Sequence, residues 1–463
     1  MTRAGERGFT LVEVVFSVAI MAVMIAAIGA LYISNIQTVT LGKARAIGLG
    51  IANEYMEQLR DLPYDSVATQ NGTIYPPGNI PDTQTVTRDN YKFTVKTEVF
   101  YVDDPYDGYA SCPCASGPAA GKPQDLYPYD YKKAQITVTL KSSGQKVATV
   151  TTDIAGKAAE TSSSTGILSI KVIDASGVGI PNANVTIVNT NPNPNVNIAT
   201  TTDNNGFVII PKLPPDSANR YQVTASLPGY STDGTIPDPP GAQTAVKLNP
   251  NVLAQQITQL TLAIDRVSTL YAHVVDTSGN PKSNFTVTIT GSKMIKQNPT
   301  VYKYGDSSGN GLLSTTDSNG DITLTGMEWD SYNFKAPSGW YLVSSSPYQP
   351  AALNPNSSLT VTLVVSNDST WPTVSSVTPT SAQTGTASVS FAITGTNLSS
   401  GTSVKLKLSG QSDINATGCT SSGGNTKLTC SVDLTGAATG AWDIAVTKSG
   451  NTATQTGGFN VTP

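Results

Sequence analysis

Histidine, cysteine and charge are all scarce in this sequence. Its 463 residues contain one histidine, His273, and four cysteines. A single histidine excludes zinc sites built from several histidines and the two-histidine motif of metalloproteases. Four cysteines are too few for disulfides to stabilise a chain of this length, so its folding must depend mainly on hydrophobic cores. Four cysteines are also compatible with an oxidising compartment.

Charged residues make up only 13% of the chain, and the net charge is −4. No block of lysine or arginine occurs in the body of the sequence, so we do not expect a nucleic acid as the main partner. Beyond about residue 65, Ser, Thr, Asn, Gly, Val and Pro dominate, which is typical of short strands and turns. At roughly 100 to 200 residues per domain, the length predicts three or four units, most of them all-β.

The N-terminus places a long apolar segment behind a short basic one. Residues 1–8 read MTRAGERG, and residues 14–33 carry no charged side chain. At about 1.5 Å per residue, a helix over residues 14–33 would span a bilayer core of roughly 30 Å. A secretory signal would have a shorter apolar stretch that ends in a small-residue cleavage site, and this segment has none. The segment therefore predicts a membrane-spanning helix.

The order of residues around Gly8 resembles the type IV prepilin family. The basic leader ends at Gly8, and FTLVE at residues 9–13 leads into the apolar run. The resemblance implies that a prepilin peptidase cleaves after Gly8, that the new N-terminal Phe9 is methylated, and that Glu13 acts in assembly. It also implies other pilin subunits as partners. The chain would be held once in the cytoplasmic membrane, N-terminus inside and C-terminus outside, before it joins an extracellular filament.

Glu13 is the one charge at the start of the apolar run. A carboxylate inside a hydrocarbon core costs about 2.5 to 3.5 kcal/mol, so it needs a partner. In a bundle of identical helices the natural partner is the Phe9 amine of a neighbouring subunit, and such a pair fixes register. The alternative is an acidic residue in the first helical turn, favoured by the helix dipole and reaching the headgroups. We favour the pairing.

Beyond the membrane segment, apolar residues recur at helical spacing and predict a packed face formed by Ile36, Ala44, Ile47, Ile51, Tyr55, Leu59 and Leu62. Pro63 disfavours helical geometry in the residue before it. Alternating polar and apolar residues then predict antiparallel strands. The expected fold is an α+β N-terminal pilin unit, formed by a long hydrophobic helix and an antiparallel sheet, followed by all-β immunoglobulin-like sandwich domains. The expected divisions are a leader peptide at 1–8, the helix at 9–62, the head sheet at 63–155, a flexible linker at 156–166, two sandwich repeats at 167–250 and 251–367, and a last sandwich at 370–463.

The expected head contains an acidic loop and two cysteines. Asp103, Asp104 and Asp107 lie in or beside Asp-Pro and Asp-Gly pairs, which predict turns, with calcium ligation as the alternative. Cys112 and Cys114 are disulfide candidates, although a bond across one intervening residue would be strained.

The two sandwich repeats share their turn residues. Asp174 and Asp203 of the first copy correspond to Asp276 and Asp317 of the second. Both copies resemble the seven-stranded regulatory-like domain found beside carboxypeptidases, in which such Asp and Gly positions form hairpin turns.

An insertion in the second repeat contains a further acidic pattern. Asp306, Ser308 and Asn310, with Asp317, fit the spacing of a calcium loop. Because Asp317 already serves a turn, we favour a plain loop and expect no cofactor, with calcium as the open alternative. The pattern GDSSG around Ser307 lacks the strand-to-helix context of a serine hydrolase.

The last part of the chain, residues 370–463, combines turn residues with one tryptophan: Pro379, Gly395, Asn397, Leu398, Gly401 and Trp442. In these residues it resembles the IPT/TIG-type immunoglobulin-like module of plexins, transcription factors and bacterial surface proteins. Cys419 and Cys430 flank a Ser, Gly and Asn-rich turn whose arms would run antiparallel, so they are disulfide candidates.

These features favour a structural subunit of a type IV pilus or pilus-like filament. One alternative is a minor pilin that acts as a surface adhesin, binding an extracellular surface or a glycan, which the large head favours. Another is a type II secretion pseudopilin. No catalytic constellation is evident in the sequence, so we do not expect an enzyme.

Overall fold

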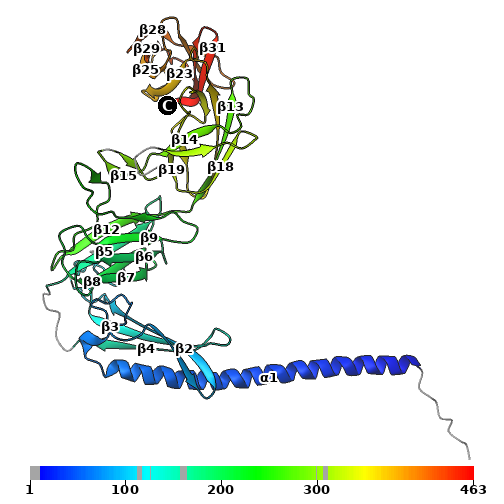
Figure 1. The fold of residues 1–463 in the computed structure, drawn as a ribbon, viewed down its shortest axis with the longest axis vertical. Helices are drawn as coiled ribbons and strands as arrows, with labels where there is room; N and C mark the ends of the chain where they lie inside the picture. The colour runs from blue at the N-terminus through cyan, green and yellow to red at the C-terminus, as the bar shows by residue number, and fades with distance from the viewer. Residues whose placement is uncertain (1–10, 112–116, 126, 157–163, 299, 306–310) are drawn as a thin grey trace, which may run out of the picture.

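The computed structural model describes residues 11–111, 117–125, 127–156, 164–298, 300–305 and 311–463. The protein consists of one long N-terminal helix followed by antiparallel β-structure, with the sheets rising in sequence order away from the helix (Figure 1). We call the first sheet with its preceding turn the head, and the three units beyond it the first, second and third sandwiches.

Helix α1 (Leu11–Arg60) has two halves with different surroundings. None of the residues at 14–39 is buried, and this half extends clear of the sheets (Figure 1). The second half packs on the head, where Ala44, Ile51 and Met56 are at most 2% exposed. The helix ends shortly before Pro63, which begins the 3₁₀ turn η1 (Tyr64–Ser66).

The head is a four-stranded antiparallel meander that covers the second half of α1. Alternate side chains of the second strand, including Phe93, Val95 and Val99, are buried against the helix. At Gly48 a Cβ atom would lie 2.7 Å from the Val147 side chain, so the glycine permits close approach of helix and sheet. The strands are β1 (Thr83–Arg88), β2 (Tyr91–Val102), β3 (Tyr131–Leu140) and β4 (Gln145–Ala155).

The first sandwich encloses its own core between two sheets. Its last strand pairs in parallel with its first, and Leu262 and Ile264 are buried in the same core. The strand that closes this sandwich therefore follows the expected boundary between residues 250 and 251. One sheet holds β5 (Gly166–Ile173), β8 (Phe207–Leu213) and β12 (Ile257–Ala263), and the other β6 (Asn184–Asn189), β7 (Val196–Thr201), β9 (Gln222–Ser226) and β10 (Asp233–Gly234).

The second sandwich repeats this plan, with its first and last strands again parallel neighbours. A small sheet, formed by β11 (Thr244–Ala245), β15 (Met294–Gln297) and β16 (Val301–Tyr302), joins a loop of the first sandwich to the second. The main strands are β13 (Ser268–Asp276), β14 (Thr286–Gly291), β17 (Leu312–Thr315), β18 (Asp321–Met327), β19 (Asp330–Lys335), β20 (Tyr341–Ser346), β21 (Ala351–Leu353) and β22 (Ser358–Ser366).

The third sandwich is built around Trp442, which is 1% exposed and donates its indole N–H to the Ala438 carbonyl at 3.0 Å. Its strands are β23 (Thr373–Thr378), β24 (Ser381–Gln383), β25 (Val389–Thr396), β26 (Ser403–Lys407), β27 (Ile414–Asn415), β28 (Thr417–Ser422), β29 (Lys427–Val432), β30 (Gly440–Lys448) and β31 (Asn451–Thr462).

The second and third sandwiches share one sheet, because β20 lies beside β31. At this contact Ser345 Oγ donates a hydrogen bond to Gln455 Oε1 at 2.9 Å, and both residues are 1% exposed. A buried and satisfied polar contact fixes the mutual orientation of the two units.

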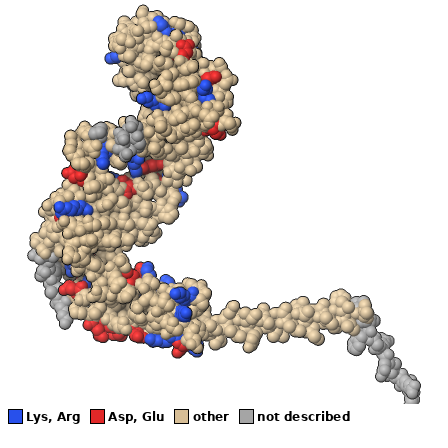
Figure 2. Space-filling model, in the orientation of Figure 1, with Lys and Arg blue, Asp and Glu red and all other residues tan. Residues whose placement is uncertain are grey.

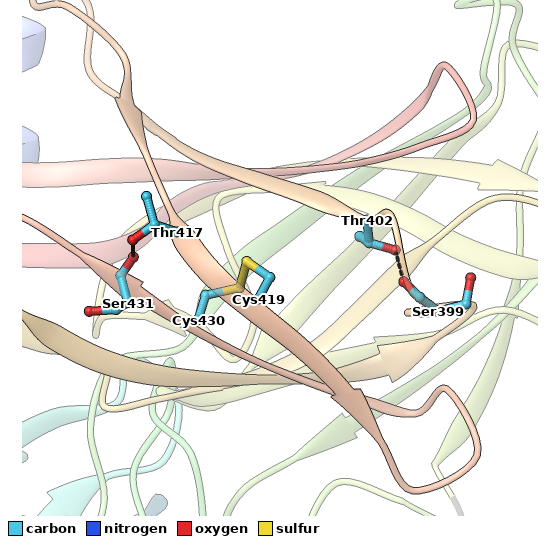
Figure 3. The surroundings of a disulfide bond; sticks show 6 residues. All are labelled: Ser399, Thr402, Thr417, Cys419, Cys430 and Ser431. Carbon is cyan, nitrogen blue, oxygen red and sulfur yellow. Dashed lines mark hydrogen bonds between the residues drawn. A yellow bond between two sulfur atoms is a disulfide. The ribbon is translucent and has the colours of Figure 1, made fainter.

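Cys419 and Cys430 form a disulfide between β28 and β29, which run antiparallel on either side of a turn (Figure 3). Cys430 is 2% exposed and belongs to the core of the third sandwich. The bond therefore ties the edge strand β28 to an inner strand of the same sheet.

Replacing both cysteines by alanine should lower the stability of the third sandwich by about 2 to 4 kcal/mol, because the crosslink restricts the unfolded chain. Urea unfolding of the full chain, followed by hydrogen exchange of peptides from β25 and β29 of the third sandwich, measures the change. Reduction of the unchanged protein is the control and should give a comparable loss. Thiol labelling of both cysteines in the native exported protein would contradict the bond.

Candidate assembly and interaction sites

The projecting half of α1 is an uncovered apolar surface. Its side chains include Phe16, Ile25 and Leu31, which are 64 to 65% exposed. Figure 2 shows this half without charged atoms, whereas lysines, arginines and acidic residues gather around the head. Among the described residues, α1 is the one helix long and apolar enough to cross a membrane. Such a surface requires lipid or other helices around it.

The sequence-predicted processing and assembly residues lie at the start of this helix. Gly8 and Phe9 are outside the described residues. Glu13 lies in the first turn of α1, although its side chain is not among those described. Placement of the backbone in the first turn is compatible with both interpretations of Glu13.

The second half of α1 is fixed to the head by polar contacts as well as by the core. Glu54 pairs with Arg88 of β1 at 2.9 Å, and Arg60 donates to Thr152 of β4 at 2.8 Å. These contacts are solvent-exposed, so each adds at most about 1 kcal/mol. The shared apolar core accordingly dominates the attachment of helix to sheet.

A cluster of tyrosines and lysines joins the head to the first sandwich. Lys212 of β8 lies over the rings of Tyr64, Tyr101 and Tyr129, at 5.8, 5.3 and 4.8 Å from their centres. Lys132 of β3 is 1% exposed and donates to the carbonyl oxygen of Tyr64 at 2.7 Å. Burial, and then the nearby Lys212, lowers the pKa of Lys132 to about 8. Cation–π contacts of this kind orient the sandwich on the head.

The repeated aspartates form matching turns, as the sequence predicts. Asp174 and Asp276 each accept backbone N–H groups two and four residues ahead, and Asp203 and Asp317 do the same. Of the predicted calcium loop, Asp317 is thus engaged in its turn. Asp306, Ser308 and Asn310 lie outside the described residues, as do Cys112, Cys114 and Ser307.

His273 is a strand residue with a partner. It lies on β13, and its Nδ1 is 2.6 Å from Asp321 Oδ1 on the neighbouring β18. His273 is therefore one partner of a cross-strand side-chain pair between β13 and β18.

A groove of about 810 Å³ separates the first and second sandwiches. Lys293 Nζ lies 3.1 Å from the centre of the Trp329 ring, and Lys293 and Lys303 both pair with Glu328, at 2.9 and 2.6 Å. The indole N–H of Trp329 is buried and has no hydrogen-bond partner. Sequence reasoning missed this groove, because its walls come from two units and no motif marks them.

The acidic loop of the head brings together carboxylates that lie far apart in the sequence. It connects β2 to β3, and its two arms meet where Tyr109 bridges Gln124. The bridge brings Asp125 close to Asp103. Burial, reinforced by the charge of Asp125, raises the pKa of Asp103 to about 7, against the opposing effect of a hydrogen bond from Ala110. Burial likewise raises the pKa of Asp125.

Two family models match parts of the sequence. Residues 3–29 match the prokaryotic N-terminal methylation motif, and residues 167–252 match the carboxypeptidase regulatory-like domain. The chain therefore carries both a pilin-type leader motif and a carboxypeptidase-regulatory-like sandwich, in agreement with the sequence analysis. The IPT/TIG assignment of the third sandwich stays a prediction, with which its two-sheet architecture is compatible.

A search of curated proteins finds no match. Solved structures that resemble the chain include the TIE protein of Bacillus anthracis (13% identity, 70% of this chain and 56% of that chain covered, TM-score 0.18), a streptococcal ancillary pilin (11%, 50% and 75%, 0.20) and the shaft pilin spaA of Lactobacillus rhamnosus GG (12%, 44% and 98%, 0.16). The chain thus covers little more than half of the first of these proteins. TM-scores this low carry no argument about function.

Proposed function

We propose that this chain is a structural subunit of a type IV pilus or pilus-like filament. It is cleaved after Gly8 by a prepilin peptidase and methylated at Phe9. Before assembly α1 spans the cytoplasmic membrane with the sandwiches outside. In the filament, the projecting halves of α1 pack on those of neighbouring subunits, and the sandwiches face the surroundings.

The division of α1 into two halves is the observation that carries this proposal. A plain membrane anchor needs only the apolar segment, but here the same helix continues as the spine of a folded head. One rigid element therefore connects the apolar surface to the exported domains. The methylation motif directly ahead of that surface agrees with processing at Gly8.

The first test is the N-terminus of the mature protein. Mass spectrometry of membrane and sheared filament fractions should show a chain that begins at Phe9 with a methylated amine. Cleavage should lower the mass by that of residues 1–8, and N-methylation should add back the mass of one CH2 group. A major species that begins at Met1 would falsify the processing step.

A second candidate function, surface adhesion by a minor subunit, is favoured by the groove between the first and second sandwiches. Its volume suits a small ligand, and an aromatic ring beside charged groups is suited to a polar ligand such as a glycan.

A further inference from the structure

The β2–β3 loop of the head contains two buried carboxylate oxygens with no partner. Asp125 is 6% exposed; its Oδ1 accepts the Tyr127 N–H at 2.7 Å, while its Oδ2 is buried and bonded to nothing. Asp103 repeats the arrangement, since its Oδ2 accepts the Ala110 N–H at 2.9 Å and its Oδ1 is buried without a partner. Each backbone bond fixes one oxygen of a carboxylate and leaves the other free.

No positive charge compensates these groups among the described residues. The charges that act on Asp103 are those of Asp125, Asp130 and Asp107, all of the same sign, and no ion pair forms with any of the four. Lys122 of the same loop lies over the Tyr106 ring at 5.5 Å instead. Buried carboxylates without a counter-charge are strongly unfavourable, so each of the two must either take up a proton or bind a cation.

We propose that the β2–β3 loop binds a calcium ion through Asp103 Oδ1 and Asp125 Oδ2. No group of three acidic, histidine or cysteine side chains in the described part of the chain forms a ready-made metal cage. The remaining ligands are therefore backbone carbonyl oxygens and water, which calcium accepts in irregular geometry, unlike magnesium.

A proton satisfies the loop less well than a cation. One proton neutralises only one of the two carboxylates and leaves the other charged beside a buried oxygen. A divalent ion instead removes the repulsion and supplies a partner to both oxygens at once. The site is independent of the filament role, because it lies within the folded head.

Calcium titration of the full processed chain in detergent micelles, first stripped with a chelator, tests the proposal. Calorimetry should show one ion per chain, with a Kd of about 10⁻⁴ to 10⁻³ M, the range of extracellular calcium modules. Asp125→Asn and Asp103→Asn should each weaken binding by at least about tenfold, through loss of ligand charge. Asp317→Asn is the matched control, because Asp317 belongs to the other acidic loop, and it should bind as the unchanged chain does.

A local readout separates a cation site from a merely structural aspartate. Tyr106 is 83% exposed in this loop, so chymotrypsin should cleave after it, and calcium should slow that cleavage. In chelator, Asp125→Asn should resist cleavage at least as well as the unchanged chain, since it removes a repelling charge. Absence of calcium binding, equal protection by magnesium, or loss of binding in Asp317→Asn but not in Asp125→Asn would overturn the proposal.

Discussion

Glu13→Val should remove the chain from filaments while leaving it processed and in the membrane. Valine raises the apolarity of the segment, so insertion is preserved or improved. Assembly instead loses the proposed partner of the Phe9 amine. Removing one member of a buried ion pair costs about 3 to 5 kcal/mol. The association constant should therefore fall at least about 100-fold. Quantitative immunoblots of sheared filament and membrane fractions measure the effect.

Glu57→Val is the matched control on the same helix. Glu57 is exposed on the second half of α1, and within the described part of the chain its side chain forms an ion pair with Arg60 alone, three residues on, at 2.8 Å. This variant should assemble normally. If Glu13→Val also assembled normally, Glu13 would be a first-turn residue reaching the headgroups, and the pairing argument would fail.

A chain that ends after residue 160 should still enter filaments but lose adhesion. The buried core of the head is built entirely from residues of α1, the segment after η1, and β2 to β4. Removal of the sandwiches leaves that core intact. The truncation exposes the tyrosine cluster and removes its contact with Lys212. It also removes the partner of Tyr75, whose hydroxyl donates to the Pro194 carbonyl at 2.7 Å in the full chain. Shearing assays and binding of whole cells to surfaces measure the two properties.

A chain that ends after residue 368 is the control for adhesion. It keeps the groove around Trp329 and loses only the third sandwich. Adhesion that survives in this control but not in the shorter chain assigns binding to the first two sandwiches. If the shorter chain failed to assemble, the sandwiches would belong to the assembly interface. If cells carrying the shorter chain still adhered, the sandwiches would be a spacer or coat.

The long helix could be predicted because its signals are local, but its packing face could not be placed fully. The sequence places Ile36 and Leu62 on the packed face, yet they are 49% and 37% exposed. Ala52 and Met56, which the periodic pattern did not include, are buried instead. The sheet covers the helix only from about residue 40 onward. Apolar residues before that point belong to the projecting half of α1, which does not pack on the sheet. Periodicity alone does not distinguish a lipid-facing stripe from a core-facing one.

Long-range pairing explains the other differences. Strand β12 lies beyond the turn pattern that marked the first repeat. Its parallel pairing with β5, whose residues lie 90 positions earlier in the sequence, assigns it to the first sandwich. Similarly, Asp125 carried no motif, because its importance comes from the bridge that brings it near Asp103. The disulfide candidates Cys419 and Cys430 could be named from sequence because their arms are joined by a short turn.

Parallel pairing of first and last strands determines how the sandwiches transmit tension. A pull along the chain enters the first sandwich at the start of β5 and leaves at the end of β12, and these neighbours are aligned over seven residue pairs. Strands β13 and β22 are aligned over eight pairs in the second sandwich. Opposite forces then act along adjacent parallel strands and load each ladder in shear. The interstrand hydrogen bonds must rupture together rather than unzip one after another, so both units resist a pull applied to the two ends of the chain.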